Sequence, residues 1–190
     1  MRKSIEQEQV DTVVIGAGQS GLASGYRLKE YGHDDFVILE GKERVGDTWR
    51  DRWDSLRLFS PARYNGLPGM PFPAAADVYP TKDEMADFLE AYSQRFQLPV
   101  RTGVWVERLA KSGSRFEIKA GRQEFKADNI IVAMSSFQCP RVPNFAPELD
   151  RDIVQLHSSQ YRNPSQLQEG PVLLVGASNS GAEIGLELAS

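Results

Sequence analysis

The chain has 190 residues, of which 41% are hydrophobic and 25% are charged, and its formal net charge is −4. These values are typical of a globular protein with one domain of ordinary size, or one domain and part of a second. The mildly acidic balance and the scattered basic residues favour neither nucleic acid nor an anionic membrane as a partner. No apolar run approaches the roughly 20 residues that a membrane helix needs.

The first nine residues and the small numbers of cysteines and histidines bear on the cellular compartment and on metal binding. We expect residues 1–9 to form a polar tail without the apolar core of a secretory signal. The single cysteine, Cys139, cannot form an internal disulfide, which favours the reducing cytoplasm. With only two histidines besides it, no His/Cys metal cluster can form, and no metal site is predicted.

A glycine motif dominates residues 10–40, which are predicted to form a β-α-β unit. The apolar residues 13–15 lead into Gly16-Ala-Gly-Gln-Ser-Gly21, and a helix is predicted over residues 20–29, with Gly32 as its stop. Gly16 permits a tight turn, Gly18 lets a pyrophosphate approach the backbone, and Gly21 lets the helix pack closely on the strand. The first N–H groups of the helix and its dipole would then attract phosphates.

Glu40 supplies the second part of this nucleotide motif. It closes an apolar run, Phe36–Leu39, at the spacing from Gly21 that dinucleotide-binding units use. A carboxylate there accepts hydrogen bonds from ribose hydroxyls and repels a 2′-phosphate, so FAD or NAD is predicted rather than NADP. The alternative is a glycine-rich turn in an ordinary α/β domain.

Residues 41–80 form a long loop rich in proline, glycine and aromatic residues. The aromatic content argues against disorder. The loop either walls a planar ligand or simply covers the sheet, and the sequence leaves both open. A capping box, Thr81-Lys-Asp-Glu84, then starts a helix whose buried stripe is Met85, Phe88, Leu89, Tyr92 and Phe96.

Strands are predicted in the next part of the chain. Residues 100–110 alternate as a strand, a hairpin turns at Gly121, and residues 128–133 form a fully buried strand that ends in a loop at residues 134–136. A further short strand is predicted over residues 153–156.

The last twenty residues repeat the opening pattern. A strand is predicted over the apolar residues 172–175, followed by Gly176-Ala-Ser-Asn-Ser-Gly181 and a helix that runs to Ala189. This segment is either one βα unit at the edge of the first sheet or the truncated start of a second nucleotide domain.

Together these residues resemble the flavin-containing monooxygenase family (class B), particularly its bacterial FAD-dependent oxidoreductases and the plant auxin-forming type. The shared landmarks extend from Val10 to Ala189. They are Gly16-Ala-Gly-Gln-Ser-Gly21, Glu40, Arg44-Val-Gly-Asp-Thr-Trp-Arg50, Leu56-Arg-Leu58, Tyr79-Pro-Thr-Lys82, Pro140-Arg-Val-Pro143, His157-Ser-Ser-Gln-Tyr161 and Gly176-Ala-Ser-Asn-Ser-Gly181. Where the family usually has Ala-Thr-Gly, this chain has Ala133-Met-Ser135.

The resemblance implies an α/β fold with two parts. Residues 1–168 would form a Rossmann-like FAD-binding domain, a parallel sheet with helices plus a small antiparallel β-meander. Residues 169–190 would be the truncated start of a second Rossmann-like domain, which binds NAD(P)H.

The resemblance also implies cofactors and the residues that bind them. FAD would lie on Gly16, Gly18, Gln19, Ser20, Gly21, Glu40, Gly46, Asp47, Thr48, Trp49, Val106, Ala133 and Met134. NADPH, with NADH not excluded, would lie on Gly176, Ser178, Asn179, Ser180 and Gly181.

The function implied is that of an NADPH-dependent monooxygenase with a small-molecule substrate and O2. In this family NADPH reduces FAD, and O2 then gives a flavin C4a-peroxide that oxygenates the substrate. No side chain is predicted to be catalytic, because the flavin carries the chemistry. Two other hypotheses stay open: a non-catalytic nucleotide-binding fragment that pairs with a second copy or another chain, and an FAD-dependent NAD(P)H oxidase that releases H2O2.

Overall fold

The computed structural model describes residues 6–136 and 138–189. One six-stranded sheet has the order β3-β2-β1-β6-β5-β4. Its strands are β1 (Glu6–Ile15), β2 (Phe36–Leu39), β3 (Val100–Arg101), β4 (Arg108–Ser112), β5 (Arg115–Ala120) and β6 (Gln123–Val132). The helices are α1 (Gln19–Glu30), α2 (Asp47–Arg50), α3 (Lys82–Arg95) and α4 (Asn179–Leu188), with short 3-10 helices at Ala62–Tyr64, Ala146–Glu148 and Pro164–Gln166.

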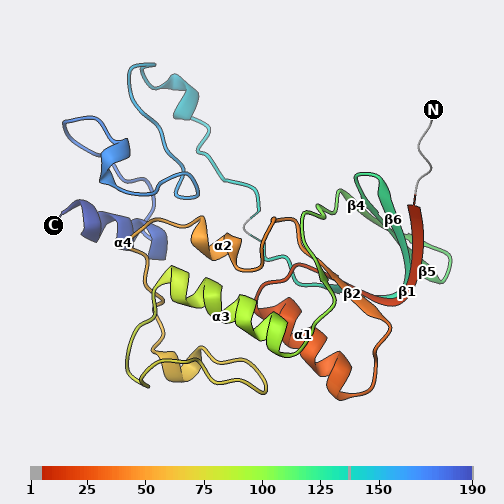
Figure 1. The fold of residues 1–190 in the computed structure, drawn as a ribbon. Helices are drawn as coiled ribbons and strands as arrows, with labels where there is room; N and C mark the ends of the chain where they lie inside the picture. Colours follow the sequence, from red (N-terminus) through yellow and green to blue (C-terminus); the bar gives the residue numbers. More distant parts are fainter. Residues whose placement is uncertain (1–5, 137, 190) are drawn as a thin grey trace.

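The sheet has a parallel half and an antiparallel half, which confirms the predicted fold class (Figure 1). Strands β3, β2, β1 and β6 are parallel, and Val13 of β1 pairs with Val37 of β2 and Ile130 of β6. Helix α1 is the crossover from β1 to β2. Strands β4, β5 and β6 form the predicted antiparallel meander, and Gly121 turns the hairpin with a φ of +59°.

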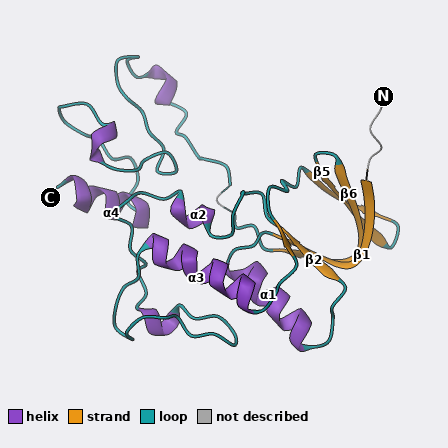
Figure 2. Ribbon diagram, in the orientation of Figure 1, coloured by secondary structure: helices purple, strands orange, loops and turns teal. Residues whose placement is uncertain are grey.

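Each face of the parallel strands has its own core. Val14 and Ile38 point to the face covered by α1 and α3, whereas their neighbours Val13 and Val37 point to the opposite face. This alternation is the two-residue period of a strand, and it lets one short sheet support two apolar clusters. Figure 2 shows the helices gathered on one side of the sheet.

Helix α3 starts with the predicted capping box. Thr81 Oγ1 accepts from the Glu84 N–H at 3.2 Å, and the Glu84 carboxylate accepts from the Thr81 N–H at 2.7 Å. The predicted stripe is buried up to Tyr92, whereas Phe96 lies just past the helix end and is half-buried against the Tyr92 ring. Burial raises the pKa of Tyr92 to about 12, and its hydroxyl donates to Pro68 O at 2.7 Å.

The prediction of a polar tail over residues 1–9 is wrong from Glu6 onward. Strand β1 already begins at Glu6, where it pairs with Gln123 of β6. Strand β6 has ten residues, so it offers backbone partners well before the apolar part of β1. Glu8 and Arg101 form a two-bond ion pair beside this extension. Residues 1–5 lie outside the described residues.

The prediction of one strand over residues 100–110 is also wrong. Only β3 and β4 form at its two ends, because the chain between them turns at Gly103, which has a φ of +66°. The N–H groups of Gly103 and Val104 donate to Lys42 O and Glu40 O, so this segment crosses the end of β2.

Residues 128–133 are not fully buried as predicted. The Val132 side chain is 60% exposed. Strand β5 pairs with β6 only over Gln123 to Ala127, so the later residues of β6 have β1 as their sheet neighbour and an open edge on the other side.

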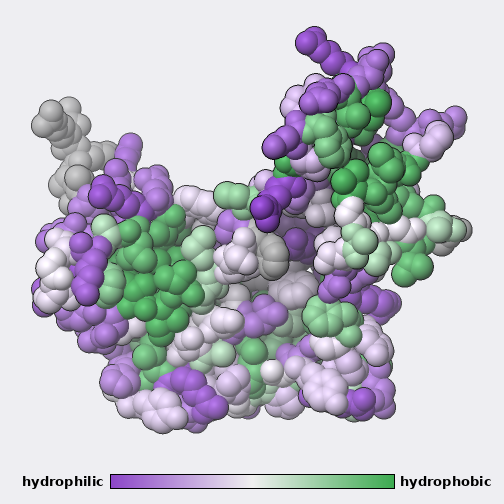
Figure 3. Space-filling model, turned by 180° about the vertical axis from the view of Figure 1, so that it is seen from behind, coloured by the Kyte–Doolittle hydropathy of each residue, from purple (hydrophilic) through white to green (hydrophobic). Residues whose placement is uncertain are grey.

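The strands predicted over residues 153–156 and 172–175 are absent from the described structure. Both segments belong to a part of the chain that projects away from the sheet (Figure 1). A strand needs a neighbouring backbone to satisfy its N–H and C=O groups, and the described sheet holds only β1 to β6. The apolar side chains there are exposed, up to 83% at Leu173, and Figure 3 shows apolar surface on the projecting part.

Candidate functional site

The first glycine turn lies where β1 ends and α1 begins. Gly16 has a φ of +101°, and its N–H donates to Leu39 O at 2.7 Å. A Cβ on Gly16 would lie 2.8 Å from Ala133 O, and a Cβ on Gly21 would lie 1.8 Å from Gly16 O. Both positions therefore exclude a side chain, in agreement with the turn and packing roles predicted for them.

Gly18 differs from the other two glycines. A Cβ on Gly18 would meet no described atom within 4 Å, so the protein itself does not require a glycine there. Open space above the middle glycine is what close approach of a ligand needs. Gln19 and Ser20 follow as the first residues of α1, and Ser20 is exposed.

The start of α1 suits an anion. No described side chain caps it, and its first turn holds no acidic residue. The first N–H groups of a helix lack partners within the helix, and the helix dipole adds partial positive charge there. A 12-residue helix with this start has the features that suit a bound phosphate.

Glu40 lies beside the turn. Its Oε2 accepts from the Ala17 N–H at 2.8 Å, and its Oε1 accepts from the Lys42 N–H at 3.0 Å. A carboxylate has about four lone-pair positions, so each oxygen can accept a further hydrogen bond. The two backbone bonds fix the carboxylate at the mouth of the turn, where ribose hydroxyls could donate to it.

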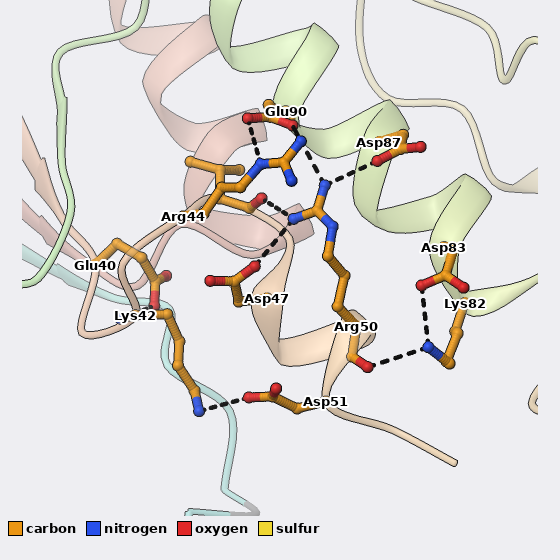
Figure 4. A network of polar contacts seen from close by, with 11 residues as sticks. Glu40, Lys42, Arg44, Asp47, Arg50, Asp51, Lys82, Asp83, Asp87 and Glu90 are labelled. Atoms are coloured by element: carbon orange, nitrogen blue, oxygen red, sulfur yellow. Dashed lines mark hydrogen bonds and ion pairs between the residues drawn. The ribbon is translucent and has the colours of Figure 1, made fainter. Parts of the chain in front are cut away.

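The loop after Glu40 is tied to α3 by a polar network (Figure 4). Arg50 donates to Val45 O, Asp47 and Asp87 at 2.8, 3.1 and 2.8 Å. Arg44 makes two bonds to the Glu90 carboxylate, at 2.8 and 2.5 Å. The bonds from Arg44 lower the pKa of Glu90. Burial alone would lower the pKa of Arg50, but the carboxylates of Asp87 and Asp47 outweigh burial and raise it.

The predicted residues of α2 face different surroundings. Gly46 has a φ of +91°, and a Cβ there would lie 2.6 Å from Ala86 O of α3. Asp47 turns toward Arg50, and Trp49 packs against the core under the helices. Thr48 is exposed, so its side chain is free of this packing and open to a ligand.

Three further predicted residues come from the end of β6 and from the segment before β4. The Ala133 N–H donates to Ile15 O at 2.8 Å, which places Ala133 and the exposed Met134 against Gly16. Val106 is half-buried against the core on the other face of the sheet. The structure thus brings Ala133 and Met134 to the first turn. Val106 is not among the residues beside this turn; its neighbour Trp105 lies with its ring against Gly41.

Ser135 stands where the resemblance leads us to expect a glycine. Its φ is +64°, in the left-handed region that glycine adopts most readily. The backbone has therefore kept the glycine conformation although the residue has changed.

The second turn copies the first in its backbone. Gly176 has a φ of +115°, and a Cβ on Gly181 would lie 2.3 Å from Gly176 O. Ser178 precedes α4, no described side chain caps this helix, and Asn179 and Ser180 form its first residues. The turn geometry is thus formed without the strand pairing that surrounds Gly16.

Helix α4 contacts the rest of the described molecule through both apolar and polar side chains. Ile184 is buried in the core under α1 and α3. The Tyr161 hydroxyl donates to Glu187 Oε2 at 2.6 Å, and burial followed by this bond raises the pKa of Tyr161.

Sequence reasoning missed the role of Lys82. Its side chain is buried, and its Nζ donates to Arg50 O at 3.1 Å and to Asp83 at 3.0 Å. The signal was present, because a lysine directly after an N-cap is unfavourable next to the positive end of a helix. A buried lysine at this position needs acceptors for its ammonium group, and Arg50 O supplies one from outside α3.

The residues that the structure describes contain no group of three or more His, Cys, Asp or Glu side chains placed to hold a metal ion. In the same residues, no helix has the length and apolar character to cross a membrane.

Known proteins resemble this chain over most of its length. A bacterial relative from Geobacillus kaustophilus, named uncharacterized oxidoreductase CzcO-like, is 47% identical over 96% of this chain and 52% of its own length. The rice indole-3-pyruvate monooxygenase YUCCA1 is 34% identical over 93% of this chain and 44% of its own length. The chain thus spans about half the length of these relatives.

A solved structure and a family profile agree with these relatives. The flavin-containing monooxygenase from Stenotrophomonas maltophilia is 36% identical with a TM-score of 0.88, over 96% of this chain and 55% of its own. The expected resemblance to flavin monooxygenases is confirmed. The profile described as pyridine nucleotide-disulphide oxidoreductase matches residues 13–190, and the chain therefore belongs to that family of oxidoreductases.

Proposed function

We propose that this chain carries the FAD-binding part of an NADPH-dependent flavin monooxygenase that acts on a small organic substrate with O2. The observation that carries the proposal is the Glu40 carboxylate, held 2.8 Å from the Ala17 N–H within the glycine turn. This bond supports the proposal because a carboxylate there would accept from a ribose, next to a helix start that would bind a phosphate. The residues fit the cofactor because the space over Gly18 is open.

The chain's own residues would bind and orient the cofactor. The turn from Gly16 to Gly21, with Gln19 and Ser20, would take the pyrophosphate, and Glu40 would accept from the ribose. Thr48, with Gly46, Asp47 and Trp49 around it, would lie along the ribityl chain or ring, Val106 would offer backbone groups to the adenine, and Ala133 with Met134 would border the flavin. When bound, the flavin would take a hydride from NADPH and activate O2.

A second nucleotide site is part of the same proposal. Residues 1–168 would form the FAD unit and residues 169–190 the beginning of the NAD(P)H unit. Its support is the second turn, where Gly176 and Gly181 repeat the close approach seen at Gly16 and Gly21. Ser178, Asn179 and Ser180 would place their N–H groups toward the nucleotide phosphates. NADPH follows the resemblance, NADH is the competing donor, and we place the protein in the cytoplasm.

The first test is FAD titration of the purified chain, followed by absorbance and by quenching of flavin fluorescence. Glu40→Gln should weaken FAD binding about tenfold to a hundredfold, because a hydrogen bond to a charged group is replaced by one to a neutral amide. Glu43→Gln, an exposed carboxylate on the same loop, should leave binding unchanged. A wild-type chain that binds no FAD would overturn the proposal.

The second test distinguishes the activities that FAD binding allows. NADPH and then NADH are added anaerobically to the FAD-loaded chain, and O2 uptake and H2O2 are measured in air. Flavin bleaching with oxygenated product supports the monooxygenase. H2O2 equal to the NADPH consumed would instead establish an oxidase, and FAD binding without any reduction would establish a nucleotide-binding fragment.

A further inference from the structure

The four-residue helix α2 cannot stabilise itself. One helical turn fixes several backbone angles for very few internal hydrogen bonds, so short isolated helices do not persist. Its conformation must therefore come from contacts with other elements. Since Thr48 on this helix is a proposed flavin contact, whatever holds α2 also sets the shape of the proposed site.

Helix α3 provides those contacts along one stripe. Lys82, Ala86 and Glu90 recur every four residues and so lie on one face of α3. Lys82 contacts the end of α2, Ala86 lies against Gly46, and Glu90 binds Arg44. Figure 4 shows Arg44 and Arg50 turned toward the acidic side chains of α3, and Lys82 turned toward the Arg50 carbonyl.

Lys82 is the unusual member of the stripe. Its side chain is only 8% exposed, and it occupies the first residue of α3, where the helix dipole disfavours a cation. Burying an ammonium group in such a place is unfavourable unless strong acceptors surround it. The Arg50 carbonyl and the Asp83 carboxylate are those acceptors, and the Arg50 carbonyl lies at the C-terminal end of α2.

Arg50 completes the attachment from the other side. Its guanidinium donates back to Val45 O, ahead of α2, and across to Asp87 of α3. The Arg50 residue is therefore held at both its carbonyl and its side chain. Thr48 of the same helix is exposed, in contrast to these anchored groups.

We propose that Lys82 and Arg50 are positioning residues that order α2 before the flavin arrives, and so determine the affinity and the environment of the bound flavin. This inference rests on the proposed FAD site. It assigns neither residue a contact with the cofactor. Pre-ordering a binding element lowers the entropy lost on binding, so loss of either residue weakens binding without removing a cofactor contact.

The test compares two lysines that both donate to backbone carbonyls at helix ends. Lys82→Met removes the ammonium but keeps a long apolar side chain. Lys29→Met is the matched control, because exposed Lys29 also donates to carbonyls just past a helix end, Phe96 O at 2.9 Å and Gln97 O at 3.3 Å. Lys82→Arg keeps the charge and the donors, and should rescue what Lys82→Met loses.

The readouts separate positioning from general stability. We expect Lys82→Met to weaken FAD binding about tenfold or more and to change the visible absorbance and circular dichroism of the flavin still bound. Lys29→Met should bind FAD as the wild type does, with an unchanged spectrum. Hydrogen exchange of residues 46–51 in the FAD-free chain should accelerate in Lys82→Met only.

Each outcome decides the inference. Wild-type affinity and spectrum in Lys82→Met would overturn it while leaving the FAD site intact, and equal losses in both methionine variants would reduce Lys82 to a general stabilising residue. A wild-type chain that does not bind FAD would overturn the proposed function as well. If Lys82→Met does not fold, Lys82→Gln, which keeps a donor without the charge, is measured in its place.

Discussion

The two glycine turns have similar backbones and different surroundings. Gly16 and Gly176 have φ values of +101° and +115°, and in each turn the last glycine lies against the carbonyl of the first. Before the first turn, β1 is paired on both sides and Val13 is fully buried; before the second, residues 172–175 are unpaired and exposed. Local sequence is therefore enough to form the turn and start the helix, whereas burial depends on partners elsewhere in the chain.

The largest expected difference between the turns comes from adding one methyl group. Gly21→Ala should lower the free energy of unfolding by more than about 3 kcal/mol, because the Cβ overlaps the Gly16 carbonyl, directly after a strand that is paired on both sides. Gly181→Ala should lower it by less than about 1.5 kcal/mol, since the unpaired backbone before it can shift. Urea unfolding measures both, and equal losses would mean that the second turn is just as constrained.

Truncating the apolar side chains of each turn should give the next largest contrast. Leu22→Ala, at a fully buried residue of α1, should lower the free energy of unfolding by about 3 kcal/mol. Leu174→Ala should lower it by less than about 1 kcal/mol, because that side chain is 41% exposed. A loss above 2 kcal/mol for Leu174→Ala would show that the second unit is packed as tightly as the first.

Removing the Tyr161 hydroxyl tests what attaches the second turn. Tyr161→Phe loses the bond to Glu187 and should destabilise α4 by about 1.5 kcal/mol, the usual contribution of a hydrogen bond to a charged group. Hydrogen exchange should accelerate in α4 and stay unchanged in α1. The exposed Tyr31→Phe is the control, and equal acceleration in both helices would contradict a local attachment.

Restoring the missing glycine should strengthen the first turn. Ser135→Gly relieves a left-handed backbone conformation and should raise the free energy of unfolding by about 0.5–1 kcal/mol after the entropy of the unfolded glycine is subtracted. The neighbouring Ser136→Gly has no positive φ to relieve and should lower stability slightly. Thermal unfolding compares the two, and a loss in Ser135→Gly would mean that its side-chain contacts outweigh the strain.

Lowering the pH should change the stability contributions of Glu90 in α3 and Glu183 in α4 in opposite directions, by less than about 1 kcal/mol each. Arg44 lowers the pKa of Glu90 below its ordinary 4.5, so the stabilisation by Glu90 is complete above pH 4.5 and is lost as the pH falls through the lowered value. Burial raises the pKa of Glu183 in α4, so its protonation adds stability as the pH falls through the raised value.

Two amide variants test these opposite changes in the free energy of unfolding with pH. Glu90→Gln should remove the loss of stability below pH 4.5, and Glu183→Gln should remove the gain above it. Urea unfolding from pH 3 to pH 7 follows both slopes. A pH profile unchanged by either substitution would contradict the assignment to these carboxylates.

Local patterns predicted the elements whose signals lie within a few residues. The capping box at Thr81, the turn at Gly16 and the hairpin at Gly121 all formed as predicted, because each depends on neighbours in the sequence. Residues 153–156 and 172–175 have strand-like composition but no strand, because strand formation also needs a paired neighbour. The start of β1 at Glu6 was missed for the converse reason, since a polar stretch was paired by a distant strand.

The candidate site also combines residues that local spacing predicts with contacts between distant residues that it does not predict. The glycines and Glu40 follow from spacing, and the structure places Glu40 against the turn. The attachment of α2 through Lys82 and Arg50 could not be predicted, because it joins residues 32 positions apart whose contacts depend on how α3 packs. The cofactor contacts of all the predicted site residues stay predictions.

The position of β1 in the sheet has a consequence for synthesis of the protein. β1 leaves the ribosome before the other strands of this sheet, yet its longest pairing is with β6, from Glu6 with Gln123 to Ile15 with Val132. Residues 16–122 must be translated before β6 can cover that edge of β1. Pairing between such distant segments is slow, and exposed strand edges are where nascent chains aggregate. Slower translation between β2 and β6 should therefore lower the soluble yield more than the same delay after Val132.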